Sequence, residues 1–563
     1  HKSIRDEYGT SDFYEGDINP GFSVTTKLPD VFYGIEETSS FSFELSNPEK
    51  EWDTIIAAEE IRGRQVTVTR TDGTLVVAGT ISGYSLGEKM RIEVEPRNND
   101  IFETLLPRAV VTTDDYTETA IDVGAPVNIC LGWCKTVPCP NIQSYKPATS
   151  TTTGTAASKL IDSAASFTDA DVGRYVHRIV DGVITDIALI TAKDSSTQLS
   201  LDSDIMASGE TYGIRCFDYL VGFGPVEGLW IAHAFNYGVK REGALVSESD
   251  YTFDDGSGAG TSHGYTGKAT IRFSREQVGF SGEQLSITAD VKGLLLGGAS
   301  AERNYATIIQ HILSDTTWGL GESVDAATFA TAAAALTDWK CDGPLYEQRK
   351  ASDILNDLLF ICRSRLHKGA DGEWEVSVDG TGASAATLGD HDGYWDNCKI
   401  TEVGGYSVSD CLKKAIVQYD VCEIYLDVRS DFGVERTYVL PFIIDNATAK
   451  KVLSYIYGRS YYADKTIRLK ADTDAENLIC GNVITVECPR HGLASALYRI
   501  TSITKSLAET KIEAESYNAS MFDDQVISDP TETSGTYETH DLQTIDSGHV
   551  GGMVISGTAI MTE

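Results

Sequence analysis

The sequence has no long apolar run. None of its 563 residues lies in a stretch approaching the roughly 20 consecutive apolar residues that a membrane-spanning helix needs. The first residues, as far as Asp17, lack the apolar segment of a secretory signal peptide. The mean hydropathy of −0.16 is ordinary for packed soluble domains. We therefore expect no membrane span, and a modular chain of roughly three to five domains.

Positive charge is also scarce. The chain has 46 Lys and Arg residues against 83 Asp and Glu residues, a formal net charge of −37. Stable binding of nucleic acid needs clustered Lys and Arg to meet the phosphates, so this balance argues against it. An acidic chain is suited to simple solubility, and also to a channel through which DNA slides without being held.

Motifs of common catalytic sites are missing. The 10 histidines are scattered singly, and neither Gly-x-Ser-x-Gly nor His-Glu-x-x-His occurs. A glycosidase-like pair of carboxylates can be neither recognised nor excluded among so many acidic residues, most of which belong to solvated faces. The Gly-rich loop 256–267 lacks the Lys-Ser/Thr of a phosphate loop and is expected to be exposed and mobile. We expect no enzyme.

Paired cysteine motifs are missing as well. The 11 cysteines are scattered and odd in number, which favours reduced, partly buried thiols over a disulfide scaffold. Cys130, Cys134 and Cys139 form a cluster that could ligate zinc or an iron–sulfur centre, with a distant fourth ligand such as Cys216. Their spacing does not match Cys-x-x-Cys, so we favour buried thiols in a β-rich turn and expect no cofactor.

Two other patterns have both a functional and a structural interpretation. Asp390, Asp392 and Asp396 lie near one another, as in a calcium loop, but the full ligand series is missing and a surface turn is favoured. An apolar stripe at helical spacing could bind a partner, although such a stripe is more often ordinary core. The stripe consists of Ile354, Leu355, Leu358, Leu359 and Cys362.

Alternation of apolar and polar residues predicts strands in two regions. In the first region an Asp72-Gly73 pair supplies a tight hairpin turn between two strands. In the second region a helix capped by Asn446 and ending near Gly458 interrupts the strands. The expected strands are 41–45, 65–70, 74–83 and 91–96, then 413–420, 423–428, 466–471, 482–487, 496–506 and 511–516.

Between these regions the apolar period changes to that of helices. Residues 301–366 contain one helix with Ile308, Ile309 and Ile312 on one face, and a second helix that Asp325 can cap. A third helix follows Ser352, and the strand 373–378 closes the segment.

The patterns together predict a multidomain, mainly β chain with a small α+β part. Short strands between turns at 148–217 indicate a small inserted β-barrel that could be removed without destroying its host. The expected segments are an N-terminal arm and first barrel region (1–147), the inserted small β-barrel (148–217), a β-rich continuation (218–300), a helical α+β subdomain (301–390), a second barrel with a packed helix (391–525) and an extended C-terminal arm (526–563).

Four passages resemble, in this order, the hub proteins of long-tailed bacteriophages, which include the baseplate hub and the hub region of tail-tip host-specificity proteins. The third passage, a helix ending in Leu-x-Asp, then Gly-Leu-Gly and an Asp-initiated helix with Phe, is the most recognisable. In the fourth passage Gly481-Asn482 stands where many members have Gly-Asp. The passages are 41–70, 122–142, 288–336 and 477–524.

The resemblance implies a structural virion protein of the tail tip, assembled in the host bacterial cytoplasm. It implies a homotrimer whose subunits each offer two similar hub-type β-barrels, so that three chains match a hexameric tail tube and form part of the DNA channel. Distal tail and tail-tube proteins are expected partners, with tail fibres or receptor-binding proteins at the C-terminal arm. The alternatives are a receptor-binding tail-tip protein that contacts host glycan or protein and, third, a secreted β-rich glycosidase.

Overall fold

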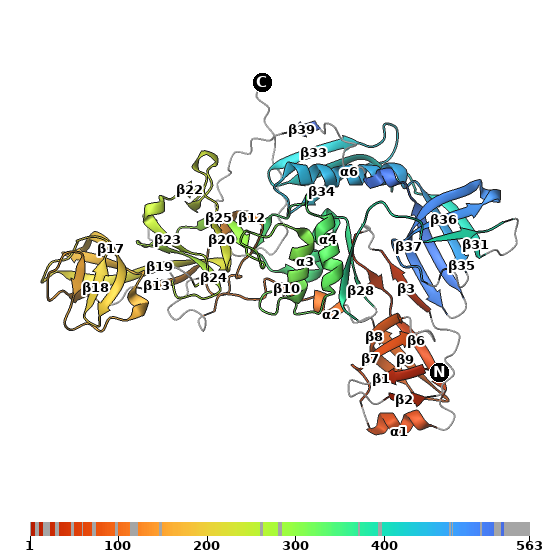
Figure 1. Ribbon diagram of the computed structural model, residues 1–563, viewed down its shortest axis with the longest axis horizontal. Helices are drawn as coiled ribbons and strands as arrows, with labels where there is room; N and C mark the ends of the chain where they lie inside the picture. Colours follow the sequence, from red (N-terminus) through yellow and green to blue (C-terminus); the bar gives the residue numbers. More distant parts are fainter. Residues whose placement is uncertain are drawn as a thin grey trace. The chain divides into compact units, whose positions relative to one another are not determined.

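The computed structural model shows a mainly β chain that divides into two compact units (Figure 1). Unit 1 consists of His1–Arg97, Leu359–Arg365 and Val378–Glu563, and unit 2 of Asn98–Leu358 and Leu366–Ser377. No helix of the described part is long and apolar enough to cross a membrane. The structure describes all residues except 1, 6–10, 15–22, 29–32, 47–49, 59, 70–74, 96–98, 113–121, 146–148, 259–262, 280–283, 370–371, 392–396, 472–474, 476, 507–508, 523–530 and 534–563.

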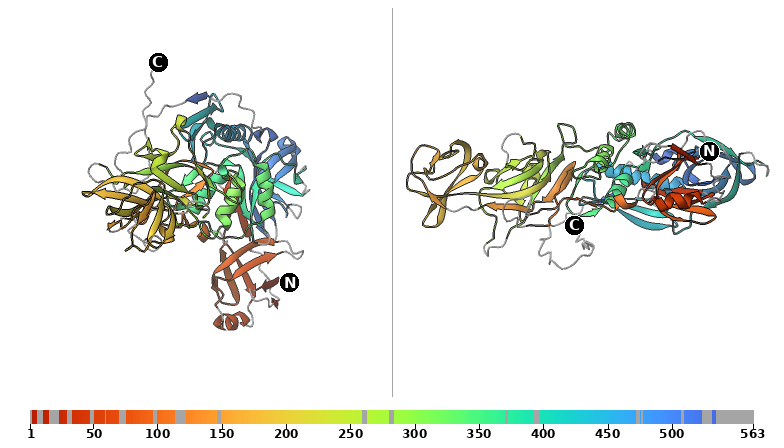
Figure 2. Two further views of the ribbon diagram at one scale, coloured as in Figure 1. Left: turned by 60° about the vertical axis from the view of Figure 1, so that its left-hand side comes forward. Right: turned by 90° about the horizontal axis from the view of Figure 1, so that it is seen from below.

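Unit 1 contains a four-stranded antiparallel sheet in the order β6-β9-β8-β7. In β9 (Lys89–Glu95), Met90, Ile92 and Val94 are buried and the residues between them exposed, because successive side chains of a strand point to opposite faces. Helix α1 (Glu51–Ala58) lies at one end of the sheet (Figures 1 and 2). The other elements are β1 (Lys2–Arg5), β2 (Ser11–Tyr14), β6 (Phe41–Ser46), β7 (Gln65–Thr69) and β8 (Leu75–Ser85).

The four strands expected near the start of the chain are confirmed by these bounds. Strands β7 and β8 pair antiparallel from Thr69 and Leu75 outward, as a hairpin requires. The Asp72-Gly73 turn expected between them lies outside the described residues.

A larger sheet of unit 1 joins the two ends of the sequence. Its main order is β30-β36-β37-β38-β35-β31, and the N-terminal strand β3 pairs antiparallel with β37. Nothing in the local pattern of residues 23–27 predicts this pairing with residues 502–506. The strands are β3 (Ser23–Lys27), β5 (Glu37–Thr38), β30 (Ala386–Gly389), β31 (Cys398–Gly405), β35 (Lys465–Ala471), β36 (Val483–Cys488), β37 (Leu493–Ser506) and β38 (Thr510–Ser516). Strand β4 (Gly34–Ile35) lies outside this sheet.

Helix α6 (Asn446–Tyr462) lies against one face of the four-stranded sheet β34-β32-β33-β39 (Figure 1). The predictions for its ends are wrong. Asp445, not Asn446, caps the helix by accepting a hydrogen bond from Thr448 N. Gly458 lies inside the helix. The backbone of Met521 packs so closely there that a Cβ on residue 458 would stand 2.9 Å from Met521 O, which explains the glycine. The strands are β32 (Leu412–Tyr419), β33 (Cys422–Asp427), β34 (Val434–Leu440) and β39 (Thr531–Thr533).

Unit 2 contains a nine-stranded sheet that includes the predicted insertion. The long strand β19 pairs with β16 through Thr211–Arg215, and farther along with β13 and β24. The insertion therefore shares β19 with the sheet that follows it. The strands are β13 (Asn141–Tyr145), β14 (Ser150–Thr151), β15 (Lys159–Ile161), β16 (Tyr175–Val180), β17 (Val183–Ser195), β18 (Gln198–Leu201), β19 (Thr211–Phe223), β23 (Tyr251–Asp254) and β24 (Lys268–Phe273).

The Gly-rich loop between β23 and β24 is not fully exposed, contrary to prediction. His263 is buried, and its ring bonds to the hydroxyls of Thr252 and Thr270 while its backbone N–H donates to Asp254. These bonds fix the described end of the loop to both strands. Residues 259–262 lie outside the described residues.

A second sheet of unit 2 has β25 (Ile287–Leu294) at its centre, beside β12 and β20 (Figure 1). Two short pairs, β11 with β26 and β10 with β27, tie earlier to later parts of this unit. The strands are β10 (Leu105–Leu106), β11 (Ile129–Leu131), β12 (Trp133–Pro138), β20 (Val226–Leu229), β21 (Val239–Arg241), β22 (Ala244–Leu245), β26 (Gly343–Leu345) and β27 (Arg349–Lys350).

The helical segment largely follows its prediction. Asn304 caps α3 (Tyr305–Ser314), and Asp325 caps α4 (Ala326–Ala335) as expected. The third helix, α5 (Ala351–Ile361), begins before Ser352, which therefore lies in its first turn rather than ahead of it. The predicted stripe on α5 is buried and forms core. The remaining elements are α2 (Asn99–Phe102), β28 (Ser364–Lys368) and β29 (Trp374–Val378).

Candidate functional site

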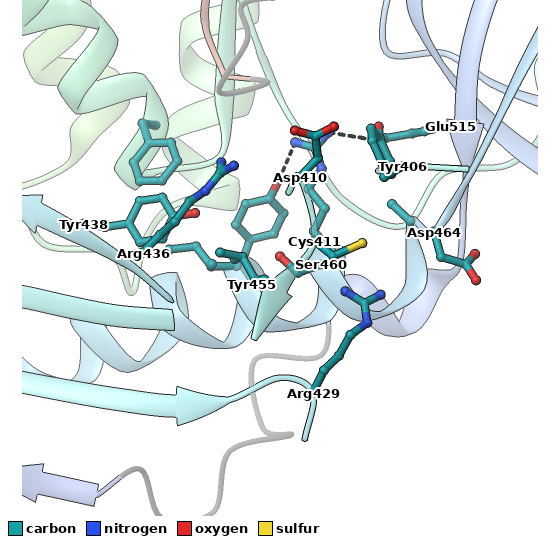
Figure 3. A pocket seen from close by; sticks show the side chains of 15 residues that line it. Tyr406, Asp410, Cys411, Arg429, Arg436, Tyr438, Tyr455, Ser460, Asp464 and Glu515 are labelled. Atoms are coloured by element: carbon teal, nitrogen blue, oxygen red, sulfur yellow. Dashed lines mark hydrogen bonds and ion pairs between the residues drawn. The ribbon is translucent and has the colours of Figure 1, made fainter. Parts of the chain in front are cut away.

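A pocket of about 380 Å³ lies in unit 1, beside helix α6 and strands β32 and β34. Aromatic side chains form one wall. Phe360 and Tyr438 stack with ring centroids 5.8 Å apart and an angle of 12° between the planes. Figure 3 shows Tyr455, from α6, next to Tyr438 and Arg436. Burial raises the pKa of Tyr438 and of Tyr455.

Two arginines of the pocket have no carboxylate partner among the described residues. Arg436 donates to the carbonyl oxygen of Ser409 at 3.4 Å, and the Arg429 guanidinium lies 5.3 Å from the ring centroid of Phe432. Asp410 lines the same pocket and accepts a hydrogen bond from Ser407 Oγ at 2.6 Å. The pocket thus offers charged groups of both signs that form no ion pair within the described residues, next to an aromatic wall.

Glu515 and Arg459 form a buried ion pair of the pocket lining. Arg459 Nη2 lies 2.8 Å from Glu515 Oε2, and the hydroxyl of Tyr406 donates to the same oxygen at 2.9 Å. Burial alone would raise the pKa of Glu515, but Arg459 and Arg499 offset it and hold that pKa below its usual value. The carboxylate is therefore fixed in its charged form.

The pair continues into a buried network that reaches the N-terminal part of the chain. Arg499 contacts Asp379 and lies 3.2 Å from Glu515. The hydroxyl of Tyr33 donates to Asp379 Oδ2 at 2.6 Å, and burial raises the pKa of Tyr33. Because each carboxylate faces at least one arginine, the network stabilises the packing of distant chain segments.

The pocket has the features of a binding site. Glu515 stays ionised, and the pKa of Tyr406 is raised by burial, so neither group exchanges protons readily near neutral pH. The unpaired arginines and the aromatic wall can receive a small polar or amphipathic group.

The predicted cysteine cluster lies in unit 2. Cys130 belongs to β11 and Cys134 to β12, and Cys139 follows β12; all three are buried. Cys134 Sγ donates to Leu131 O at 3.3 Å and Cys139 Sγ to Val137 O at 3.4 Å. Burial raises the pKa of both thiols.

A metal centre would need these thiols in their thiolate form. Within the described ranges, no three His, Cys, Asp or Glu side chains are grouped so that they could hold a metal ion. Cys216, the suggested fourth ligand, is buried in β19. The zinc or iron–sulfur centre stays the less favoured alternative that the sequence left open.

Asp390 of the possible calcium loop has structural partners. Its Oδ2 accepts a hydrogen bond from Ile400 N at 2.8 Å and pairs with Arg490 at 2.5 Å. Asp392 and Asp396 lie outside the described residues.

Sequence reasoning missed the pocket entirely. Its lining comes from short stretches between Phe360 and Glu515, and no stretch contains a motif. The arginines carry no local signal, because their lack of a partner depends on the fold.

No family model matches the chain, and no curated protein matches it either. Among solved structures, it is similar to the 43 kDa tail protein of prophage MuSo2 from Shewanella oneidensis, at 11% identity and a TM-score of 0.38, covering 92% of this chain and 98% of that one. It is also similar to the tail protein from Neisseria meningitidis MC58, at 10% identity and a TM-score of 0.37, covering 91% and 95%. A chain of the virion of a native gene transfer agent particle matches at 14% identity and a TM-score of 0.37, covering 66% and 90%. Scores this low do not establish a shared fold.

Proposed function

We propose that this chain is a structural virion protein, the central hub of a bacteriophage tail tip. The observation that carries the proposal is the resemblance of four passages, in order, to hub proteins. Characteristic residues of these passages form turns and helix caps in this chain. The passages are 41–70, 122–142, 288–336 and 477–524.

In the third passage, the most recognisable, the motif residues form a turn and a helix cap. Asp315 accepts hydrogen bonds from the backbone N–H groups of Thr317 and Trp318, which turns the chain after α3. Gly319 lies where a Cβ would stand 2.5 Å from Ile312 O, so only glycine fits. Asp325 then starts α4. The motif residues thus specify one helix–turn–helix geometry.

The fourth passage follows the same logic. Gly481 has a φ of +81°, and a Cβ there would clash with the Arg365 guanidinium. Asn482 Oδ1 accepts a hydrogen bond from Ile479 N at 3.1 Å, so Asn can serve where many hub proteins have Asp. The departure from the family pattern therefore keeps the turn.

The proposed role is mechanical. Each chain would supply two similar hub-type β-barrels, from the regions 1–147 and 391–525, and a homotrimer would present six similar surfaces to a hexameric tail tube. Three chains carry a formal charge of about −111, three times −37, so a channel lined by part of that charge would let DNA pass without holding it.

The proposal includes a place and partners. The protein assembles in the bacterial cytoplasm and resides at the virion tail tip. It contacts distal tail and tail-tube proteins, and residues 526–563 contact a tail fibre or receptor-binding protein. It does not bind nucleic acid stably.

The mass of the purified native protein tests the proposal. A single chain has a mass of 61.0 kDa, so a trimer has three times that mass, about 183 kDa. Light scattering over a range of concentrations should give the trimer. A stable monomer at every concentration would contradict the hub.

A further inference from the structure

Unit 2 carries a cluster of aromatic rings at the end of β20. The centroids of Trp133 and Trp230 lie 4.9 Å apart, and those of Trp230 and Tyr237 lie 4.3 Å apart. Phe235 stacks beside Tyr237 at 6.1 Å, yet 72% of its surface is exposed. The neighbouring Ile231 is also exposed. A single exposed apolar side chain is ordinary, but Phe235 together with Ile231 and the neighbouring rings forms an apolar patch of the kind that marks an interaction site.

The loop that carries these rings is held in one conformation. Ala232 and Tyr237 exchange backbone hydrogen bonds of 3.1 and 3.2 Å, and Asn236 takes the left-handed conformation at a φ of 57°. At the foot of the loop the buried Asp290 accepts from Gly238 N at 2.9 Å and pairs with Lys240 at 2.8 Å. A ring on so constrained a loop loses little entropy when a ligand covers it.

Charged and polar side chains surround the cluster. The Arg303 guanidinium lies 4.2 Å from the ring centroid of Trp133 and pairs with the buried Asp342. His233 and Glu248, both well exposed, lie 3.0 Å apart beside the loop. Lys135 Nζ lies 5.5 Å from the ring centroid of Tyr237. The surface therefore combines apolar ring faces with hydrogen-bonding groups.

We infer that the cluster of Trp133, Trp230, Phe235 and Tyr237 is a binding site for a neutral hexose oligosaccharide. The C–H face of a hexose is apolar and packs on an aromatic ring, while its hydroxyl groups need polar neighbours such as Glu248 and Asn236. A strongly acidic glycan is disfavoured by the net charge of −37 of the chain. The site does not rest on the proposed hub function, because a single chain contains all of it.

Saturation-transfer NMR on the full chain tests the site, with neutral glucose-, galactose- and mannose-based tetrasaccharides as probes. The decisive variant is Phe235→Ala, which removes an exposed ring and leaves the core untouched. Phe432→Ala in unit 1 is the matched control, since Phe432 is also exposed and lies beside an arginine. We expect at least one probe to bind the native chain, with affinity lowered at least about tenfold by Phe235→Ala and unchanged by Phe432→Ala.

Three outcomes would overturn the inference. The native chain binds none of the probes at millimolar concentration, or Phe235→Ala binds them as well as the native chain does. In the third outcome, no probe binds and the Phe235→Ala variant has a lower native mass than the unsubstituted protein, which would assign the rings to an interface between copies of the chain. A monomeric chain that binds a probe through Phe235 would support the inference and contradict the hub alone.

Discussion

At the scale of residues, buried charges are held by opposite charges in both units. In unit 1 Arg499 faces Asp379 and Glu515, and in unit 2 Arg272 reaches both oxygens of Asp218 at 2.7 and 2.8 Å. A buried pair adds little net stability over an apolar pair, but removal of one partner leaves a buried charge without compensation. The buried ion pairs therefore favour one arrangement of the packed chain segments over others.

The substitution Arg499→Met should destabilise unit 1 by about 3–5 kcal/mol, because Asp379 and Glu515 lose their shared partner. Denaturant unfolding of the full chain measures the effect. Arg468→Met is the control, since the ion pairs of Arg468 with Glu402 and Glu513 are exposed and should contribute little. Equal losses of stability from the two substitutions would contradict this role of the buried network.

His177 should make unit 2 sensitive to acid. Burial, with Arg215 adding to it, lowers the pKa of this histidine from 6.5 to about 4. Below pH 6.5 the unfolded chain binds a proton that the folded chain refuses, so stability present above that pH is lost as the pH falls towards 4. The loss amounts to roughly 3 kcal/mol.

Unfolding measured between pH 7 and pH 4 checks this prediction. The variant His177→Leu should reduce the pH dependence without abolishing it, because burial also lowers the pKa of His263 in unit 2, to about 3. Replacement of the exposed His491 by Asn should leave the pH dependence unchanged. If the native chain and His177→Leu lose stability in parallel, the titration of His177 is not the cause.

At the scale of elements, the strands of the predicted insertion share β19 with the rest of unit 2. The residues on either side of the segment 153–208 nevertheless lie next to each other. Thr152 N donates to Glu210 O at 2.9 Å, and Gly209 N donates to Thr152 O at 2.9 Å. A short loop can therefore replace what lies between, provided that β19 itself is kept. Its residues Tyr212 and Ile214 belong to the core of the insertion and would become exposed.

Replacement of residues 153–208 by a short Gly-Ser loop, combined with Ile214→Thr, should leave a folded chain. The remaining part of β19 keeps its pairs with β13 and β24. Thermal unfolding and native mass should match those of the intact protein apart from the mass removed. An insoluble product would mean that the inserted strands are required for unit 2 to fold.

The turn after α3 gives a second prediction at this scale. Gly319→Ala should destabilise unit 2 by roughly 1–3 kcal/mol, because the added Cβ would meet carbonyl oxygens that cannot move easily. Gly298→Ala is the control, since its nearest neighbour would be 3.7 Å away. Thermal unfolding that ranks the two variants in the opposite order would reject the assigned role of Gly319.

The sequence predicted most elements and few of their partners. The alternation of apolar and polar residues located β9, and the capping residue Asp325 located α4, because both signals are local. The pairing of β3 with β37 depends on residues far apart in the chain, and no local pattern contains it. The same holds for the pocket, whose lining is assembled from separate stretches between Phe360 and Glu515.

At the scale of the whole molecule, the chain leaves unit 1 at Arg97 and returns to it at Leu359. Strand β3 near the start pairs with β37 near the end, so unit 1 is complete only when nearly the whole chain is present. Each copy thus links two β-rich units by paired crossings of the chain.

The stoichiometry of the complex with a hexameric ring of tail-tube protein tests the central claim most directly. Native mass spectrometry of the two purified proteins, mixed and separated by size, provides it. The hub proposal predicts three copies of this chain for each ring of six tube subunits. A complex with one or six copies for each ring, or no complex at all, would contradict it.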